Sequence, residues 1–114
     1  MPPSVEDRFR YVLEAIDDID EMLAGVSLEQ FTNSKLLRKA TERNLEIMCE
    51  AARHFRDKVK QSAPGIDWFK MNDFANLLRH AYYSTKVDIV WDIVHSHVPP
   101  LKSFVELQIR ASGK

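Results

Sequence analysis

The sequence predicts an all-α protein, an up-and-down bundle of about five helices. Two observations lead to this: apolar residues recur at helical spacing over long stretches, and 114 residues contain only three glycines and five prolines. Glycine and proline are the strongest breaks in secondary structure, so their scarcity predicts long elements, and long periodic elements are helices. With 45% hydrophobic residues the chain can bury a core, and its length suits a single domain over residues 1–114.

The first helix is predicted between a capping residue and a glycine. Ser4 can cap its start, with Asp7 three positions later as a near-match to the capping box, and Gly25 can end it. The apolar residues between them follow the i, i+3, i+4, i+7 rule: Phe9, Val12, Leu13, Ile16, Ile19 and Leu23.

A short helical turn and a long helix are predicted next. Ser27 and Gln30 match a second capping box, which indicates the short turn. The long helix starts at Asn33 or Ser34 and runs to about Lys60. Its apolar surface is wide, which fits either a central helix of a bundle or a helix that also forms a dimer contact.

Prolines delimit the remaining elements. The segment 63–65, Ala-Pro-Gly, breaks the chain, and a third helix is predicted over about 67–83. A fourth is predicted over about 87–97, and Pro99-Pro100 is expected to stop it. Pro100 can also be the first residue of a fifth helix.

The charge is balanced overall but uneven along the chain. The net charge of −1 does not indicate a general nucleic-acid-binding surface. Residues 4–25 hold seven acids against two bases, and residues 34–60 hold eight bases against four acids. Two interpretations remain open: two solvated faces that attract each other, or a basic helix that meets phosphates.

The sequence predicts a cytoplasmic protein without a membrane partner. The single cysteine, Cys49, cannot form an internal disulfide and lies in a helical stretch, so we expect a buried, unreactive thiol. The acidic N-terminal region has no apolar core of a signal peptide, and no run of apolar residues approaches the length of a membrane span.

Common cofactor and metal motifs are absent from the sequence. There is no GxxxxGK[ST], GxGxxG, HExxH or CxxC pattern. His95 and His97 are two residues apart and do not face each other on a helix, whereas His54 lies in a basic stretch and is expected at the surface. We therefore expect neither a metal site nor a cofactor.

The segment NLLRHAYYS (76–84) is the main candidate for chemistry. At about 100° per residue, Asn76, Arg79, His80 and Tyr83 share one side of the predicted helix, and Tyr82 lies one turn from Arg79. The structural interpretation is a helix end in which cations suit the dipole and tyrosines sit at the edge of the core. The functional interpretation is a phosphate-handling site.

The chemistry of that second interpretation is simple. A neutral histidine such as His80 can take a proton near pH 7, and an adjacent arginine such as Arg79 can hold phosphate oxygens. Together with a ribose 2′-hydroxyl these groups suffice for metal-independent cleavage of RNA. The residue pattern by itself leaves both interpretations open.

Three segments resemble the HepT toxin family of the HEPN superfamily. They are RKATERNLEIMCEAARHF (38–55), PGIDWFKM (64–71) and LLRHAYYSTKVDIVWDIV (77–94), in the family's order and spacing over nearly the whole chain. The His-x-Tyr followed by an Ile-Val-Trp helix is the most specific part. The resemblance implies a HEPN-like helical homodimer with a ribonuclease cleft between protomers. It also implies an antitoxin partner, an MntA-type nucleotidyltransferase that silences the toxin by transferring AMP to a tyrosine.

The family motif, Arg-x4-His-x-Tyr with Asn usually after the Arg, maps onto this chain residue by residue. The resemblance makes His80 the motif histidine, Tyr82 the motif tyrosine and AMP acceptor, and Asn76 the common asparagine. The motif arginine is missing, because Ala75 stands in its place. Residue 79 lies one helical turn from residue 75, so we hypothesise that Arg79 supplies the missing guanidinium.

These observations together predict a HepT-like, metal-independent ribonuclease. His80 would act as general base on the 2′-hydroxyl, Arg79 would bind the scissile phosphate, and basic residues of the long helix would add affinity for RNA: Lys39, Arg43 and Arg53. The alternative is a non-enzyme, a HEPN-type helical dimer that has lost activity with the motif arginine. Such a dimer would bind RNA, or would serve as a scaffold for the partner nucleotidyltransferase.

Overall fold

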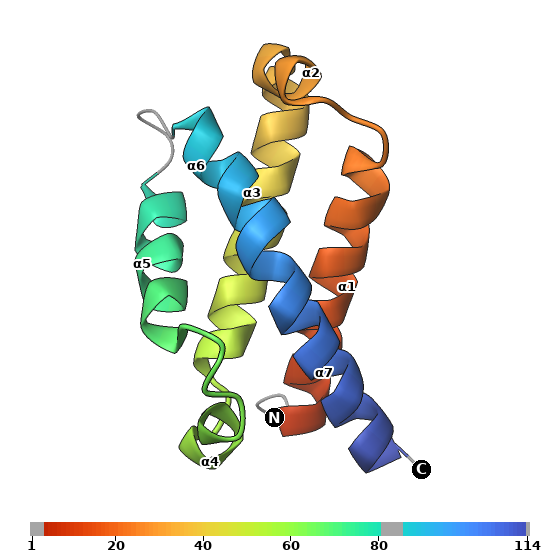
Figure 1. Cartoon of the computed structure of the whole chain (residues 1–114), viewed down its shortest axis with the longest axis vertical. Helices are drawn as coiled ribbons and strands as arrows, with labels where there is room; N and C mark the ends of the chain where they lie inside the picture. The colour runs from red at the N-terminus through yellow and green to blue at the C-terminus, as the bar shows by residue number, and fades with distance from the viewer. Residues whose placement is uncertain (1–3, 81–85, 114) are drawn as a thin grey trace.

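The structure, a computed structural model, describes residues 4–80 and 86–113, and within these ranges the chain consists of helices and loops. The long helices run alternately up and down the molecule (Figure 1), so the predicted all-α up-and-down bundle is confirmed. The elements in chain order are α1 (Val5–Leu23), α2 (Leu28–Asn33), α3 (Lys35–Arg53), α4 (Asp57–Gln61), α5 (Trp68–Arg79), α6 (Val87–Asp92), the π-helical turn η1 (Ile93–His97) and α7 (Val98–Gly113).

The predicted helix starts are confirmed by their capping hydrogen bonds. The backbone N–H of Asp7 donates to Ser4 Oγ, and the Ser4 N–H donates back to the Asp7 carboxylate, both at 3.1 Å. Ser27 and Gln30 form the same reciprocal pair at 2.9 and 3.1 Å. Of the two predicted starting residues of the long helix, Asn33 and Ser34, it is Ser34 that caps α3. Each pair satisfies two backbone donors that a helix start would otherwise leave without partners.

The prediction of one helix over about 34–60 is wrong at its C-terminal end. The helix α3 stops at Arg53, and a short turn leads into α4. His54 caps α3, and its N–H donates to carbonyl oxygens of the last turn. The turn directs the Phe55 side chain into the core, where it is 3% exposed and its ring centroid lies 4.8 Å from that of Phe9. Burial of this aromatic ring outweighs the local preference for a longer helix.

The prediction that Pro99-Pro100 separates two helices is also wrong. The helix α6 continues through η1 into α7, and both prolines lie inside the helical segment. A proline ring clashes with the carbonyl four residues earlier in an α-helix. Here the turn just before the prolines is widened to a π-helix, in which the Val98 N–H donates to the Ile93 carbonyl five residues earlier. The wider turn accommodates the prolines without ending the helix.

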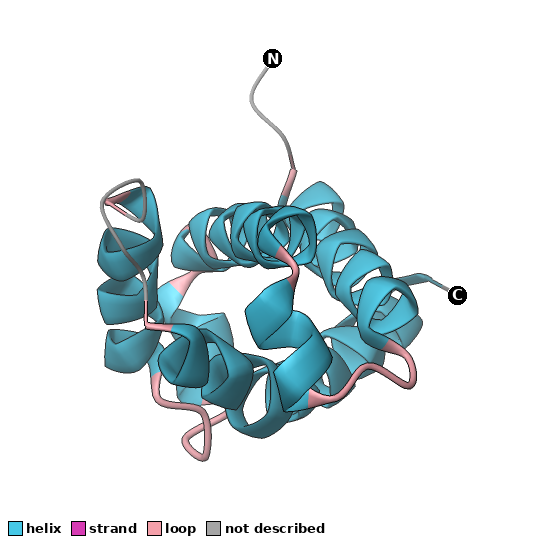
Figure 2. Cartoon of the chain, turned by 90° about the horizontal axis from the view of Figure 1, so that it is seen from above, coloured by secondary structure: helices cyan, strands magenta, loops and turns pink. Residues whose placement is uncertain are grey.

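The helices are arranged around the centre of the molecule (Figure 2), and their buried apolar side chains form one core. The helix α1 packs along α3 and α7, and α5 packs along α3. Cys49 is 1% exposed, and burial raises the pKa of its thiol to about 12, so the predicted buried thiol is confirmed. None of the helices in the described ranges is both long and apolar enough to cross a membrane. The largest fully buried side chains include Ile16, Ile19, Phe31, Leu45, Met48, Ile93 and Leu101.

The acids of α1 pair with a base of α7 in the described residues. Lys102 Nζ lies 2.7 Å from Asp20 Oδ2 and 3.5 Å from Asp17 Oδ1. The hydrogen bond to Asp20 raises the pKa of Lys102. Among the bases of α3, Arg43 and Arg53 instead pair with acids of the same helix and line the hollow described below.

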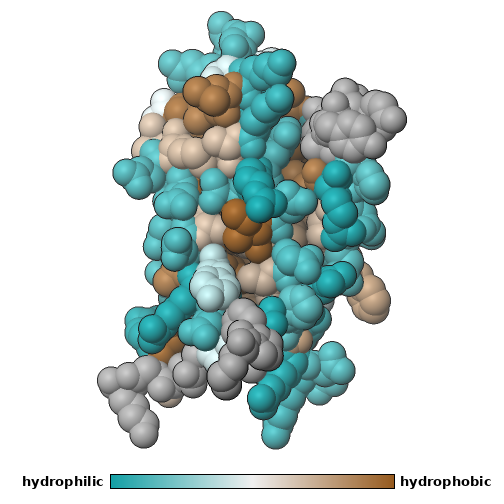
Figure 3. All heavy atoms as spheres, turned by 180° about the vertical axis from the view of Figure 1, so that it is seen from behind, coloured by the Kyte–Doolittle hydropathy of each residue, from teal (hydrophilic) through white to brown (hydrophobic). Residues whose placement is uncertain are grey.

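The face of the molecule seen from behind is mainly hydrophilic (Figure 3). Seen from behind, hydrophobic surface forms separate patches among hydrophilic side chains (Figure 3). Leu36 of α3 and Phe69 of α5 are the most exposed large apolar side chains among the described residues, at 83% and 85%.

Candidate active site

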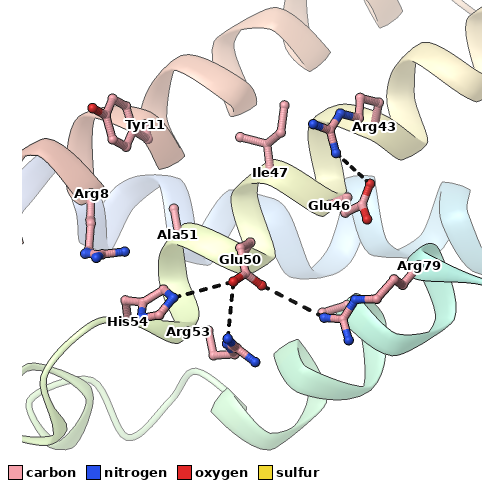
Figure 4. A pocket seen from close by; sticks show the side chains of 11 residues that line it. Arg8, Tyr11, Arg43, Glu46, Ile47, Glu50, Ala51, Arg53, His54 and Arg79 are labelled. Atoms are coloured by element: carbon pink, nitrogen blue, oxygen red, sulfur yellow. Dashed lines mark hydrogen bonds and ion pairs between the residues drawn. The ribbon is translucent and has the colours of Figure 1, made fainter. Parts of the chain in front are cut away.

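An open hollow of about 680 Å³ lies between α1, α3 and α5. Most of its wall comes from one face of α3, with α1 on one side and α5 on the other (Figure 4). Among the charged groups, cations outnumber carboxylates. The lining residues are Arg8 and Tyr11 of α1, Arg43, Glu46, Ile47, Glu50, Ala51 and Arg53 of α3, His54 after it, and Ala75 and Arg79 of α5.

Helical spacing explains why these side chains share the hollow. On α3, Arg43, Glu46 and Glu50 follow one another at three- and four-residue steps and project from one face. On α5, Ala75 and Arg79 are four residues apart, so they also lie on one face. Because α5 packs against α3, the two faces enclose the hollow.

The Glu50 carboxylate is the centre of the charged contacts. Its Oε1 lies 3.2 Å from Arg53 Nη2 and 3.5 Å from His54 Nε2. Its Oε2 lies 3.9 Å from Arg79 Nη2 (Figure 4). Two arginines and one histidine, from α3, its C-terminal cap and α5, therefore converge on one anionic group.

These ion pairs are exposed to solvent and therefore weak. The side chains of Glu50, Arg53, His54 and Arg79 are between 43% and 49% exposed. Exposed pairs of this kind typically contribute about 0.2–1 kcal/mol each. Another anion, such as a phosphate, can therefore replace the Glu50 carboxylate at modest cost.

A hydrogen bond joins two of the predicted site residues, Asn76 and Arg79. Arg79 Nη1 donates a hydrogen bond to Asn76 Oδ1 at 3.4 Å, within one turn of α5. His80 caps the C-terminus of α5 with an exposed side chain. Among the described residues, Arg79 lines the hollow and His80 does not. Tyr82, the predicted AMP acceptor, lies outside the described residues.

Ala75 lines the same hollow as Arg79. Its side chain is 3% exposed, at the contact between α5 and α3. Position 75 lies about one helical turn, 5.4 Å along the axis, before Arg79 on α5. Residues 75 and 79 thus line one hollow, and the replacement of the missing arginine by Arg79 stays a prediction.

The three basic residues predicted to contact RNA do not lie in one place. Arg43 and Arg53 line the hollow, and Arg43 Nη1 also lies 2.9 Å from Glu46 Oε1. Lys39 is exposed one turn before Arg43 on α3, outside the set that lines the hollow. Two of the three predicted bases thus line the hollow. Arg8 of α1, which the sequence analysis did not single out, lines it as well.

Sequence reasoning missed Glu50 and the placement of His54. His54 is exposed as predicted, but it also lines the hollow and contacts Glu50, as Arg79 does from α5. The four-residue spacing from Glu50 to His54 could have indicated that these two side chains pair. Their proximity to α5 depends on helix packing, which spacing does not show.

Comparison with known proteins places the chain among proteins of one family. Residues 12–107 match the family model described as "Ribonuclease HepT-like". A protein of Methanocaldococcus jannaschii, provisionally named as an RNase, is 32% identical over 96 residues, which cover 84% of this chain and 88% of that protein. A protein of Thermococcus cleftensis named "Probable ribonuclease HepT" is 32% identical over 106 residues, 93% of this chain and 96% of its own length. No solved structure was found to match the chain.

Proposed function

The chain belongs to the HepT-like ribonuclease family, and we propose that it cleaves RNA without a metal ion. The observation that carries the proposal is the convergence of Arg53, His54 and Arg79 on one exposed carboxylate in a cation-rich hollow. Such a set of donors fits the oxygens of a phosphodiester. The family match supports RNA as the source of that phosphate.

In the proposed reaction, RNA supplies its own nucleophile. His80 removes the proton of a ribose 2′-hydroxyl, and the oxygen attacks the adjacent phosphorus. Arg79 binds the non-bridging phosphate oxygens and stabilises the charge that develops in the pentacoordinate transition state. Asn76 holds the guanidinium through its hydrogen bond to Arg79 Nη1. The products are a 2′,3′-cyclic phosphate and a 5′-hydroxyl.

The test is cleavage of total RNA by the wild type, Arg79→Ala and His80→Ala, with the new ends mapped. We expect wild-type cleavage that leaves cyclic phosphates, with loss of activity in both variants. Arg110→Ala removes an exposed arginine of α7 and serves as the charge-matched control, which should cleave normally. Full activity of Arg79→Ala beside an inactive His80→Ala would show that Arg79 does not replace the missing arginine.

Addition of a chelator tests the metal-independent mechanism separately. Because a histidine and an arginine provide proton transfer and charge stabilisation, the activity should survive EDTA. A strict requirement for Mg²⁺ would refute the mechanism.

We further propose that an MntA-type nucleotidyltransferase antitoxin silences the protein by transferring AMP to Tyr82. The family resemblance supports this, and so does the position of Tyr82 three residues after Arg79. The added phosphodiester would compete with RNA phosphate for the guanidinium. After incubation with the cognate nucleotidyltransferase and ATP, mass spectrometry should locate one AMP on Tyr82. Tyr82→Phe should abolish the modification, whereas Tyr83→Phe should not.

The proposed assembly is a homodimer. The family resemblance supports it, and α3 carries exposed apolar side chains, Leu36 and Ile47, which are 83% and 37% exposed. Sedimentation equilibrium should give twice the 13.2 kDa mass of one chain. A monomer at micromolar concentration would refute the assembly.

Ala75 favours one alternative, a helical dimer that binds RNA or the nucleotidyltransferase without cleaving. The same cleavage assay decides between the two functions. RNA that binds the wild-type protein and stays intact, at every concentration that saturates binding, would establish the scaffold and refute the ribonuclease.

A further inference from the structure

The outward face of α3 carries a stripe of exposed and partly exposed side chains at the spacing of a coiled-coil seam. Positions 36, 40, 43, 47, 50 and 54 follow one another at alternating steps of four and three residues. Such steps keep side chains on one face of a helix, where a second helix can pack along them. Although α1, α2 and α5 pack against α3, positions 43, 47, 50 and 54 stay in the open wall of the hollow.

The middle of this stripe is apolar. Ile47 is 37% exposed, and Tyr11 of the neighbouring helix α1 is 46% exposed. The two side chains line the hollow together, and they also line a smaller hollow of about 130 Å³ beside it (Figure 4). Ile47 and Tyr11 therefore form a small apolar patch, and contact with another protein surface would remove it from water.

The charges beside Ile47 are self-complementary. Arg43 lies four residues before it and Glu50 three residues after it, so opposite charges stand on its two sides along α3. Seven residues of an α-helix make about two turns and 10 Å, so both side chains project from one face. In an antiparallel pair of α3 helices with the two-fold axis beside Ile47, each Arg43 meets the Glu50 of the other copy. A parallel pair would instead place like charges side by side, which is repulsive.

We propose that α3 pairs antiparallel with α3 of a second copy of this chain, with the two-fold axis at Ile47 and Arg43 of each protomer paired with Glu50 of the other. This inference rests on the homodimer of the proposed function and specifies the surface that forms it. Ile47 and Tyr11 of both copies form the apolar centre of the contact. One arginine–glutamate pair lies on each side of that centre, as the symmetry of an isologous interface requires.

The contact gives each hollow a side chain from the other protomer. Within one chain, Arg43 Nη1 lies 2.9 Å from Glu46 Oε1. Of the cations around the Glu50 carboxylate, Arg79 is the farthest, at 3.9 Å. The partner's Arg43 joins this carboxylate in the dimer and competes with Arg79, the cation that it holds least closely. Dimer formation thereby leaves Arg79 more readily available to an RNA phosphate.

Replacement of Ile47 by cysteine tests the position of the axis. A residue at a two-fold axis lies against its own copy, so the introduced thiols come within the roughly 4 Å between Cβ atoms that a disulfide requires. We expect Ile47→Cys to give a disulfide-linked dimer on a non-reducing gel after mild oxidation of dilute protein. The wild type serves as the background control, because Cys49 is 1% exposed.

Leu36→Cys is the control for cross-linking by random collision. Leu36 is 83% exposed, more than Ile47, so collisions alone would cross-link Leu36→Cys more readily. It lies on the same stripe of α3, but about 16 Å along the helix from Ile47, so its own copy is far away in the proposed dimer. We therefore expect a lower yield of cross-linked dimer from Leu36→Cys than from Ile47→Cys.

Exchange of the two charges tests the pairing. Arg43→Glu and Glu50→Arg should each raise the dissociation constant of the dimer about tenfold or more, because each places like charges opposite one another. The double variant restores opposite charges, and its dissociation constant should return to within about twofold of the wild-type value. Arg110→Glu reverses an exposed charge of α7 and should leave the dimer unchanged. Sedimentation equilibrium measures all four variants.

The outcomes separate this contact from the homodimer itself. A dimeric protein in which Ile47→Cys cross-links no more than Leu36→Cys would refute the axis at Ile47 and leave the homodimer standing. A double variant that dissociates as readily as the single variants would refute the pairing of Arg43 with Glu50. A wild type that stays monomeric at micromolar concentration would refute the homodimer and this contact together.

Discussion

Replacing Glu50 by glutamine should strengthen RNA binding. Arg53, Arg79 and His54 contact the Glu50 carboxylate in the RNA-free protein, and an RNA phosphate has to compete with it for these side chains. Glutamine keeps the size of the side chain and removes its charge. The cations then face the hollow without an internal partner, and the phosphate approaches without repulsion.

The expected gain follows from the distances and the exposure. Two unit charges about 4 Å apart interact by about 1 kcal/mol in water-like surroundings. The Glu50 side chain is 49% exposed, so the watery limit is the appropriate one. A free energy of about 1 kcal/mol corresponds to about fivefold in affinity, and screening by salt reduces it. We therefore expect a gain of about two- to fivefold at low salt.

The assay is fluorescence anisotropy with a labelled 2′-O-methyl RNA, which cannot be cleaved by its own 2′-hydroxyl. Glu106→Gln is the matched control, since it removes the same charge from an exposed position on α7. Its affinity should change less than that of Glu50→Gln, and the difference should shrink as salt increases. Weaker binding by Glu50→Gln, or equal gains in both variants, would refute the idea that Glu50 competes with phosphate.

Three further predictions concern stability and reactivity. Thr41→Val should raise the free energy of unfolding, measured in urea, by about 1 kcal/mol. The buried Thr41 Oγ1 has no hydrogen-bond partner among the described residues, and valine has a similar shape. A loss of stability would contradict this prediction. Cys49 should react with a thiol reagent in urea but not in the native protein at pH 8, since burial raises the pKa of its thiol to about 12. Rapid labelling of the native protein would show that the thiol is accessible and reactive. Burial also raises the pKa of the Glu42 carboxyl above 4.5, against the opposing charges of Arg38 and Lys39. The folded state therefore holds this proton more tightly than the unfolded state, and the carboxylate costs stability at neutral pH. Glu42→Gln should raise the melting temperature at pH 7 and not below pH 4, and an equal effect at both pH values would show that protonation is not the cause.

Local features of the fold could be predicted from the sequence, whereas features that depend on packing could not. The capping residues Ser4 and Ser27 act through hydrogen bonds three residues away, so their pattern is visible in the sequence. The end of α3 depends on Phe55 reaching Phe9, which lies in another helix. The continuation through Pro99 depends on a widened turn just before it, and no local signal indicates a π-helix there.

In the candidate site, too, contacts within one helix could be predicted from the sequence, whereas contacts between helices could not. Asn76 and Arg79 lie three residues apart on one helix, so their hydrogen bond could be anticipated from spacing. The contact of Arg79 with Glu50 joins positions 29 residues apart in sequence, on α5 and α3. Since only the packing of those helices brings the two side chains together, the charge at the centre of the hollow could not be found from the sequence.

The position of the arginine has a consequence for the mechanism. In the family motif the arginine stands five residues before the histidine, whereas Arg79 is adjacent to His80. Arg79 lines the hollow, whereas His80 caps the C-terminus of α5 and is not among the residues that line it. A phosphate held by Arg79 in the proposed reaction therefore lies in the hollow, where the Glu50 carboxylate already contacts that guanidinium.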